Sequence, residues 1–480
     1  MSGDPRHEAA DDALHEAPFE GRLLRLILIV TFGPLLLNLS STTINVAIDK
    51  LMVDLRAPLS VVQWVVTGYL LALTLVLPAF RWAVERVGSR RLYVACLLGF
   101  TATSALSALA WSAPSLIAFR VLQGAVGGLL APLTQTLIAQ LAGPKRMGRA
   151  VSIISVPFLV APLFGPTLGG FLIERLSWRW LFLFNVPLGL CGAWLAHRRL
   201  PPGETVSRTR LDLVGLALLS PGIALFTYGL SALGHAQGAL TGRALLPLAA
   251  ALFLVTAFVL HARRRPATAL LDLNVFRHRA VGASLVIYLL TSFSSFGGQF
   301  ILPLYYQQAR GESPTHAGML IAAQGLGMLL TLPQIGKLTD RVDHGKLVML
   351  GVLATLIGTY AFTQATDHTS YLLLSAALVI RGAGLGATNT PALAAAYRNL
   401  ARDEIPNATA TLNIVQRLGA PLGVATMVVA LQRFAPARRT PALLARAFAH
   451  TFALSAILSA LALFAALALI RSNTSERSPA

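Results

Sequence analysis

The stretch RWAVERVGSRR, Arg81 to Arg91, lies between two long apolar runs and places an acid directly before an arginine, then glycine and more bases. A similar stretch, GKLTDRVDHGK, follows at Gly336 to Lys346, a shift of 255 positions from Arg81 to Gly336. Each stretch reads as a short loop between two helices at a membrane surface. The pair predicts that the chain contains an internal duplication.

Two further pairs of motifs keep nearly the same spacing. GPTLGG at Gly165 to Gly170 is echoed by APLG at Ala420 to Gly423, which again gives a shift of 255. Gln123 and Gly124 are echoed by Arg381 and Gly382 at a shift of 258. The duplication therefore extends well beyond the two charged loops.

Composition indicates an integral membrane protein, because the 480 residues are 55% hydrophobic and only 12% charged. The net charge of +19 would suggest nucleic acid in a soluble protein. Here the bases gather in alternate loops, so no nucleic-acid partner is expected. Cys96 and Cys191 lie inside apolar runs without a CxxC or His/Cys cluster. Both are expected to be buried, with no disulfide framework, metal site or cofactor.

Runs of about 20 apolar residues, the length that crosses the hydrocarbon layer, predict fourteen transmembrane helices. Residues 1–21 carry six acids against one arginine and are expected to form a disordered cytoplasmic tail. The expected crossings are 24–48, 60–80, 91–111, 114–140, 147–173, 178–196, 211–233, 243–262, 280–306, 314–335, 346–365, 369–397, 405–432 and 446–470.

The distribution of basic residues predicts the orientation of these helices. With a cytoplasmic amino terminus, 26 of the 39 Lys and Arg lie in cytoplasmic segments and 10 in the opposite loops, with three inside helices. The positive-inside rule then places both termini in the cytoplasm. One loop departs from the rule, since Arg433, Arg438, Arg439 and Arg446 fall on the expected outer side.

The shift of 255 relates helices 2, 4 and 5 to helices 10, 12 and 13, so two helices are inserted at the centre. The predicted fold is therefore an all-α membrane protein with two six-helix bundles and an inserted pair. Repeated bundles are typical of alternating-access transporters, which bind substrate between the repeats. The expected segments are the tail 1–21, bundle 22–197, linker with inserted helices 198–279, bundle 280–471 and cytoplasmic tail 472–480.

The two charged loops are candidate gates, because a carboxylate beside a guanidinium can pair across a loop and hold one face closed. Simple anchoring at the membrane surface is the alternative, although it would need neither an acid nor a second copy. The candidate gating residues are Glu85, Arg86, Gly88, Arg90, Arg91, Gly336, Asp340 and Arg341.

Helix 4 contains FRVLQGAVGG, which puts Arg120, Gln123 and three glycines on one face. A charged residue near the middle of a transmembrane helix is costly, so Arg120 is expected to be functional. Bonding to carbonyls of a neighbouring helix is the structural alternative. Candidate substrate or coupling residues are Arg120, Gln123, Asn45, Gln299, Gln324, Arg381, Asn389, Asn413, Gln416 and Arg417. Gly165, Pro166, Gly169 and Gly170 predict a bent, closely packed helix 5.

These motifs resemble the fourteen-helix drug:proton antiporters of the major facilitator superfamily, of the QacA and EmrB type. RWAVERVGSRR is similar to the superfamily's first gating motif, FRVLQG to its helix 4 motif and GPTLGG to its antiporter motif. More specific to the fourteen-helix branch are SWRWLFLFNVP at Ser177 to Pro187, LDLVG at Leu211 to Gly215 and LPLYYQQARGESPTHAG at Leu302 to Gly318.

The resemblance implies roles for individual residues. Arg120 would aid proton coupling or substrate binding, Glu85, Arg86 and Asp340 would form the inner gate, and Gly165 to Gly170 would set helix packing for exchange. The chain departs from the family pattern at Ser40, where aspartate is usual in helix 1. It also has Arg81 in place of glycine and Glu85 in place of aspartate in the first motif.

The leading hypothesis is a proton-coupled exporter of small amphipathic molecules in a bacterial inner membrane. A facilitator or importer on the same fold is the alternative, and a membrane enzyme is disfavoured because the helices hold no cluster of His, Asp or Cys. A periplasmic adaptor would be a further partner in a two-membrane cell. No helix carries a carboxylate near its middle, so neutral or anionic cargo is expected over dications. Proton coupling is then expected at water beside Arg120 or at Asp49, Glu174 or Asp212.

Overall fold

The computed structural model describes residues 21–201, 212–235, 242–264, 279–339, 342–397, 405–435 and 440–475. These ranges are helical, with short turns and no β-strand among them. The helices of the N-terminal part are α2 (Gly21–Val30), α3 (Phe32–Val46), α4 (Ile48–Asp54), α5 (Leu59–Val62), α6 (Trp64–Leu75), η1 (Leu77–Ala79), α7 (Phe80–Val87), α8 (Ser89–Ala108), α9 (Ala113–Gly127), α10 (Leu130–Arg175), α11 (Trp180–Leu183) and α12 (Asn185–Arg199).

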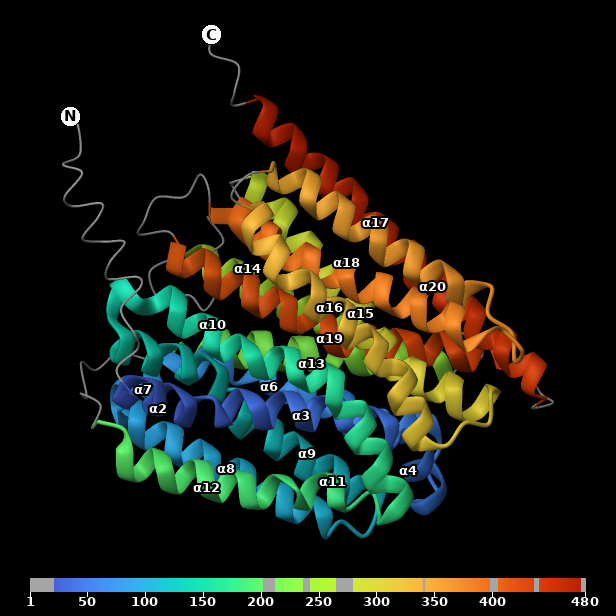
Figure 1. Cartoon of the computed structure of the whole chain (residues 1–480), viewed down its shortest axis with the longest axis horizontal. Coiled ribbons are helices and arrows are strands. Elements are labelled where there is room, and N and C mark those ends of the chain that lie inside the picture. The colour runs from blue at the N-terminus through green and yellow to red at the C-terminus, as the bar shows by residue number, and fades with distance from the viewer. Residues whose placement is uncertain are drawn as a thin grey trace.

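The rest of the chain continues the pattern. The remaining helices are α13 (Leu213–His235), α14 (Gly242–Arg264), α15 (Arg279–Leu304), η3 (Tyr305–Ala309), α16 (Pro314–Thr339), α17 (His344–Thr363), α18 (Tyr371–Tyr397), α19 (Ile405–Phe434) and α20 (Pro441–Ser475). Below, α2–α12 are called the N-terminal helices and α15–α20 the C-terminal helices. The two groups form the lower and upper parts of Figure 1.

The described residues contain eleven helices long and apolar enough to cross a membrane, or twelve if the bent pair 48–54 and 59–75 is one span. The two predicted crossings outside this set, 147–173 and 314–335, are helical within α10 and α16. Each of the fourteen predicted crossings thus coincides with a helix in the described residues. The structure is therefore compatible with fourteen transmembrane helices. The chain is a multi-pass membrane protein.

The 46-residue helix α10 contains parts of two crossings. Thr134 donates to the Val30 carbonyl at 3.4 Å, and the Ala161 carbonyl accepts from Thr42 at 3.3 Å. A straight helix would separate Thr134 from Ala161 by about 40 Å, whereas Val30 and Thr42 are separated by only about 18 Å along their helices. Helix α10 therefore folds back between these contacts, and both of its arms lie against the first crossing.

The internal repeat recurs in the packing. Gly124 of α9 lies so close to the Tyr69 carbonyl that a Cβ would collide with it, and Gly382 of α18 meets the Gln324 carbonyl in the same way. Tyr69 and Gln324 are again 255 positions apart. Small residues let helix backbones approach this closely. Helix α6 thus packs on α9 as α16 packs on α18.

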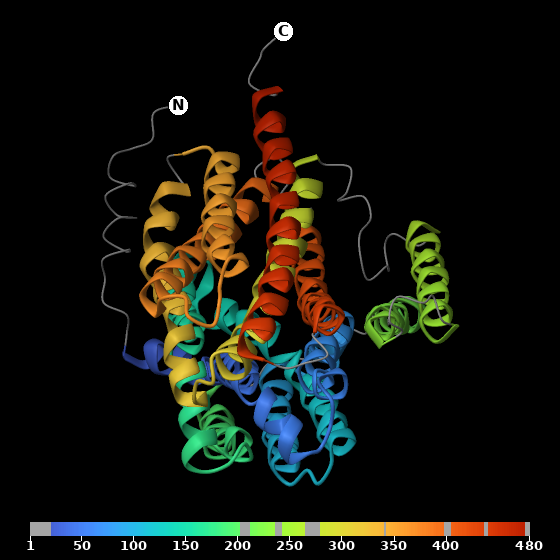
Figure 2. The same cartoon turned by 90° about the vertical axis from the view of Figure 1, so that its right-hand side faces the viewer.

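The inserted helices α13 and α14 pack on each other and lie to one side of the two main groups (Figure 2). Leu219, Ile223 and Phe258 of this pair form a small apolar cluster with Leu71 of α6 and Ile414 of α19. The inserted pair therefore contacts both groups along the line where α6 meets α19.

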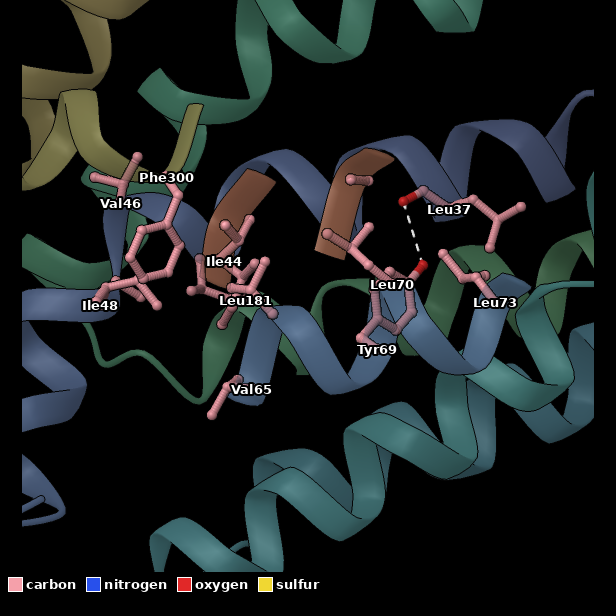
Figure 3. Packing of buried hydrophobic residues seen from close by; sticks show 14 of the residues in the cluster. Leu37, Ile44, Val46, Ile48, Val65, Tyr69, Leu70, Leu73, Leu181 and Phe300 are labelled. Carbon is pink, nitrogen blue, oxygen red and sulfur yellow. Dashed lines mark hydrogen bonds between the residues drawn. The ribbon is translucent and has the colours of Figure 1, made fainter. Parts of the chain in front are cut away.

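The main apolar core joins the two groups directly. In Figure 3, Phe300 of α15 points toward Val46 and Ile48, while Tyr69 of α6 points toward α3 and donates from its hydroxyl to the Leu37 carbonyl at 3.5 Å. All of these side chains are at most 1% exposed, except Leu37 at 7%. The two groups are therefore packed against each other through a continuous buried cluster.

Two expectations were wrong. The stretch 81–91 is mainly helical rather than a loop, because only Gly88, with φ of 85°, interrupts the path from α7 to α8. Cys191 is exposed rather than buried, because it lies on the outward face of α12. Cys96 is buried, as predicted.

Candidate functional site

The buried Arg120 in α9 lies at the centre of the N-terminal helices. Its guanidinium donates to the Val65 carbonyl at 3.1 Å, to the Ser40 hydroxyl at 2.9 Å and to the Gln123 side-chain oxygen at 2.6 Å. The guanidinium carbon also lies 3.8 Å from the centroid of the Tyr69 ring, a cation–π contact. Arg120 is fully buried, and Nη2 has no hydrogen-bond partner within the described structure.

The environment of Arg120 is therefore made of neutral groups. Its neighbours come from α3, α6 and α9, and no ion pair involves it in the described part of the chain. The sequence indicated Gln123 as a neighbour, since it lies one helical turn from Arg120. Tyr69 was not predicted as a neighbour of Arg120. It lies 255 positions before Gln324, a predicted site residue, so the internal repeat could have identified it.

Arg381 of α18 is a buried cation within the C-terminal helices. Its guanidinium donates to the Gln324 side-chain oxygen and, at 2.7 Å, to the Ser294 carbonyl. Gly298 provides the space, because a Cβ there would collide with the guanidinium. Arg381 is 3% exposed, so this second buried cation is also bound to neutral oxygens.

A cavity between the two groups of helices brings three of the predicted site residues together. It has an empty volume of about 350 Å³, a value that includes space open to solvent. Asn45 comes from α3, Gln299 from α15 and Gln324 from α16. The full lining is Thr42, Asn45, Val46, Pro166, Gln299, Pro303, Ile321, Gln324 and Gly325.

The other predicted polar residues lie elsewhere. Thr74 of α6 donates to the Arg417 carbonyl at 3.5 Å, which places this part of α19 beside α6. Asn389 accepts through its carbonyl from Tyr288 at 2.9 Å, and its side-chain oxygen is buried without a partner in the described structure. Asn413 is exposed and Gln416 is half-buried. None of these four is among the residues that line the cavity.

One end of the molecule is closed by polar contacts between the two groups of helices. Gln308 donates to the Asp49 carboxylate at 2.7 Å, and Gln307 donates to the Val46 carbonyl at 2.9 Å. Glu174, at the end of α10, accepts from the backbone N–H of Thr315 in the first turn of α16 at 3.4 Å. A carboxylate is favoured at a helix N-terminus. We call this the closed end.

Small residues bring α10 and α16 together just inside the closed end. A Cβ on Gly170 would collide with the Pro314 carbonyl, and one on Gly318 would collide with the Pro166 carbonyl. Gly165 and Gly169 lie against Thr42 and Thr43 of α3. The four residues of the predicted packing motif therefore touch α3 on one side and α16 on the other, while Pro166 also lines the cavity.

Glu174 lies just after the predicted crossing 147–173 and its side chain is exposed. Its hydrogen bonds favour the ionised carboxylate. Hydrogen bonds from the side chains of Thr315 and Ser313 hold the pKa of Glu174 below its ordinary value, and the nearby charge of Arg175 adds to the effect. The ionised carboxylate is therefore the form that binds α16. Asp212, the third acid considered for proton coupling, instead pairs with His261 at 3.0 Å inside the inserted pair.

The described part of the first charged stretch is bound within the N-terminal helices. Arg90 donates to the His197 carbonyl at the end of α12, and Arg86 lies 5.7 Å from the centroid of the Trp82 ring. Gly88 forms the turn and Arg91 is exposed. In the second stretch, Gly336 lies in α16, whereas Asp340 and Arg341 fall outside the described residues. The pairing of the two stretches thus remains a prediction.

Comparisons with known proteins agree with this architecture. A family model described as "Major Facilitator Superfamily" matches residues 30–284 and 284–480. The chain is 37% identical to the "Multidrug resistance protein B homolog" of Mycobacterium tuberculosis over 412 residues, which cover 85% of this chain and 76% of that protein. It is 29% identical over 411 residues to the "Putative multidrug resistance protein MdtD" of Klebsiella pneumoniae, covering 82% and 83% of the two chains.

Solved structures share the fold at low sequence identity. The crystal structure of the nucleoside transporter NupG superposes with a TM-score of 0.68 at 11% identity, covering 94% of this chain and 100% of that one. At this level of identity the likeness concerns the arrangement of helices alone.

Proposed function

Since the chain belongs to the Major Facilitator Superfamily and is a membrane transporter, we propose that it exports small amphipathic molecules in exchange for protons. The observation that carries this proposal is a cavity lined by residues of both groups of helices, with polar contacts closing one end of the interface between them. Alternating access requires a site between two repeats that rock against each other. The names of the relatives in M. tuberculosis and K. pneumoniae support drugs or toxins as cargo.

The predicted domains and orientation belong to the same proposal. Residues 22–197 and 280–471 act as the two moving bundles, and 198–279 carries the inserted pair. Both termini face the cytoplasm of a bacterial inner membrane, as the partition of basic residues supports. The closed end then faces outward, so the described conformation has its outer side shut. A periplasmic adaptor remains a proposed partner in a two-membrane cell.

The gating and coupling residues are also proposed. The stretches 81–91 and 336–346 keep the cytoplasmic side closed in the other conformation of the transport cycle, in which the outer side is open. Arg120 responds to substrate or to a proton-bearing water, because it is buried and its Nη2 amino group has no hydrogen-bond partner in the described structure. Protons reach the outer carboxylates Asp49 and Glu174 when the closed end separates.

A transport assay distinguishes export from the alternative of facilitated diffusion. Purified protein is placed in liposomes with an imposed pH gradient and tested with a panel of dyes and antibiotics. An antiporter accumulates its cargo against a concentration gradient only while the pH gradient lasts. A facilitator equilibrates cargo at the same rate with or without the gradient, and that result would remove the proposed coupling.

A further inference from the structure

The cavity between the two groups of helices is polar but uncharged. Of the nine described residues that line it, three are carboxamides, one is a threonine and the others are apolar or glycine. Val46, Ile321 and two prolines supply its apolar surface. The lining thus offers hydrogen bonds and apolar contact, with neither a carboxylate to attract a cation nor an arginine to attract an anion.

The nearest cation in the hydrogen-bond network is already bound to protein oxygens. Arg381 reaches the cavity lining only through Gln324, whose side-chain oxygen accepts from its guanidinium. Its other contact is the Ser294 carbonyl at 2.7 Å. An anionic ligand would have to replace these bonds to reach the guanidinium. An organic cation would approach a buried positive charge without a balancing acid, which is unfavourable at low dielectric constant.

Asn45 supplies an acceptor that lacks a donor. The residue is 5% exposed, and its side-chain NH2 donates to the Ser41 carbonyl at 3.2 Å. Its oxygen Oδ1 is buried and has no hydrogen-bond partner in the described structure. Buried polar atoms are nearly always satisfied, so this acceptor in the cavity wall is available to a donor on water or on a bound molecule.

We propose that this cavity binds an uncharged amphipathic molecule that donates a hydrogen bond to Asn45 Oδ1, in preference to an organic cation or anion. Gln299 and Gln324 border the same bound molecule. The statement that this molecule is also the transported cargo rests on the proposed function. The binding preference does not, because it follows from the lining of the cavity alone.

Three fluorescent probes built on one dansyl ring test the preference. Dansylamide is uncharged and donates from its sulfonamide, dansylglycine carries a carboxylate and dansylcadaverine carries an ammonium group. Each is titrated into the full-length protein in lipid nanodiscs and followed by its fluorescence. Dansylamide is expected to bind at least about tenfold more tightly than either charged probe. Equal or tighter binding of dansylglycine or dansylcadaverine would overturn the proposal.

Substitutions in the lining locate the binding. Gln299→Glu adds a carboxylate to the cavity, so the variant should bind dansylcadaverine at least about tenfold more tightly than the wild type does. Gln364→Glu is the matched control, because Gln364 is exposed at the end of α17. Asn45→Leu removes the acceptor and should weaken dansylamide binding by a similar factor. If Gln299→Glu leaves the affinity for dansylcadaverine unchanged, the probes bind elsewhere and the proposal fails.

The outcomes separate this inference from the proposed function. Tight dansylamide binding without any substrate-driven proton movement would leave the inference standing and remove the coupling. Proton-coupled transport by a protein that binds dansylcadaverine more tightly than dansylamide would support the proposed function and overturn this inference.

Discussion

The guanidinium of Arg120 donates to the hydroxyl of Ser40 at 2.9 Å, deep among the N-terminal helices. Ser40 occupies the position where an aspartate is usual in the antiporters that the sequence resembles. A neutral oxygen therefore takes the place of a charged partner, and the ring of Tyr69 at 3.8 Å supplies the other main contact. A cation held in this way depends on the shape of its hydrogen-bonding groups more than on charge pairing.

Replacement of Arg120 by lysine tests that dependence. A lysine keeps the charge but cannot reach Val65, Ser40 and Gln123 from one planar group. We expect Arg120→Lys and Arg120→Ala to reduce gradient-driven transport by at least about tenfold, or about 1.4 kcal/mol. Arg25→Lys, at an exposed arginine in α2, serves as the control. Wild-type transport by Arg120→Lys would show that the guanidinium geometry is unnecessary.

Acidification should weaken the contact of Glu174 with α16. Because its pKa is lowered in the closed state, the ionised carboxylate stabilises this state above the ordinary glutamate pKa of about 4.3. The contribution is lost as pH falls through the lowered value. Spin labels at Val53 and Met319, with both native cysteines changed to serine, report the distance across the closed end. At low pH, a larger fraction of the molecules should show a longer distance between the two spin labels.

Glu174→Gln should mimic protonation and show the longer distance already at neutral pH. Glu312→Gln is the matched control, because in the described structure the Glu312 carboxylate binds His316 and Tyr371, which both belong to the C-terminal helices. An unchanged distance distribution in Glu174→Gln would mean that this carboxylate does not hold the closed end.

The glycines between α10 and α16 should resist substitution. A methyl group at Gly170 would meet the Pro314 carbonyl, and one at Gly318 would meet the Pro166 carbonyl. Overpacking of this kind costs about 1–3 kcal/mol. We expect Gly170→Ala and Gly318→Ala to shift the Val53–Met319 distance toward the separated state. Gly282→Ala, with no atom within 4 Å of its added Cβ, should leave the distance unchanged.

The orientation is tested by accessibility of single cysteines. Ser207 precedes α13 in a segment expected in the cytoplasm, and Gly238 lies between α13 and α14 on the expected outer side. In a background with the native cysteines changed to serine, an impermeant maleimide added outside cells should label Gly238→Cys and spare Ser207→Cys. The opposite pattern would invert the topology.

The sequence was informative where one physical requirement acts on a continuous segment. Long apolar runs predicted the helices because a crossing needs about 20 such residues. The repeat was visible because close backbone approach at Gly124 and Gly382 restricts both positions to the smallest residue. Asn45, Gln299 and Gln324 were predicted as candidate site residues because they are polar residues within apolar helices, and the structure places all three in the lining of one cavity.

Other features depend on how distant segments meet, which no local pattern encodes. The bond between Glu174 and Thr315 joins residues 141 positions apart and exists only because the two groups of helices meet at the closed end. Thr42 and Pro303 look like ordinary helix residues until α3 and α15 are placed side by side. The exposure of Cys191 depends on which face of α12 is turned outward.

Proton movement driven by an uncharged ligand is the most direct test of the proposed exchange. Liposomes with an acidic lumen and a trapped pH-sensitive dye receive dansylamide from outside. Because an uncharged probe can recross the bilayer unaided, lumen pH is the readout rather than probe retention. We predict that dansylamide alkalinises the lumen with wild-type protein, and that Arg120→Ala and protein-free liposomes show no response. A lumen pH that is the same with wild-type protein as in protein-free liposomes would contradict proton-coupled export.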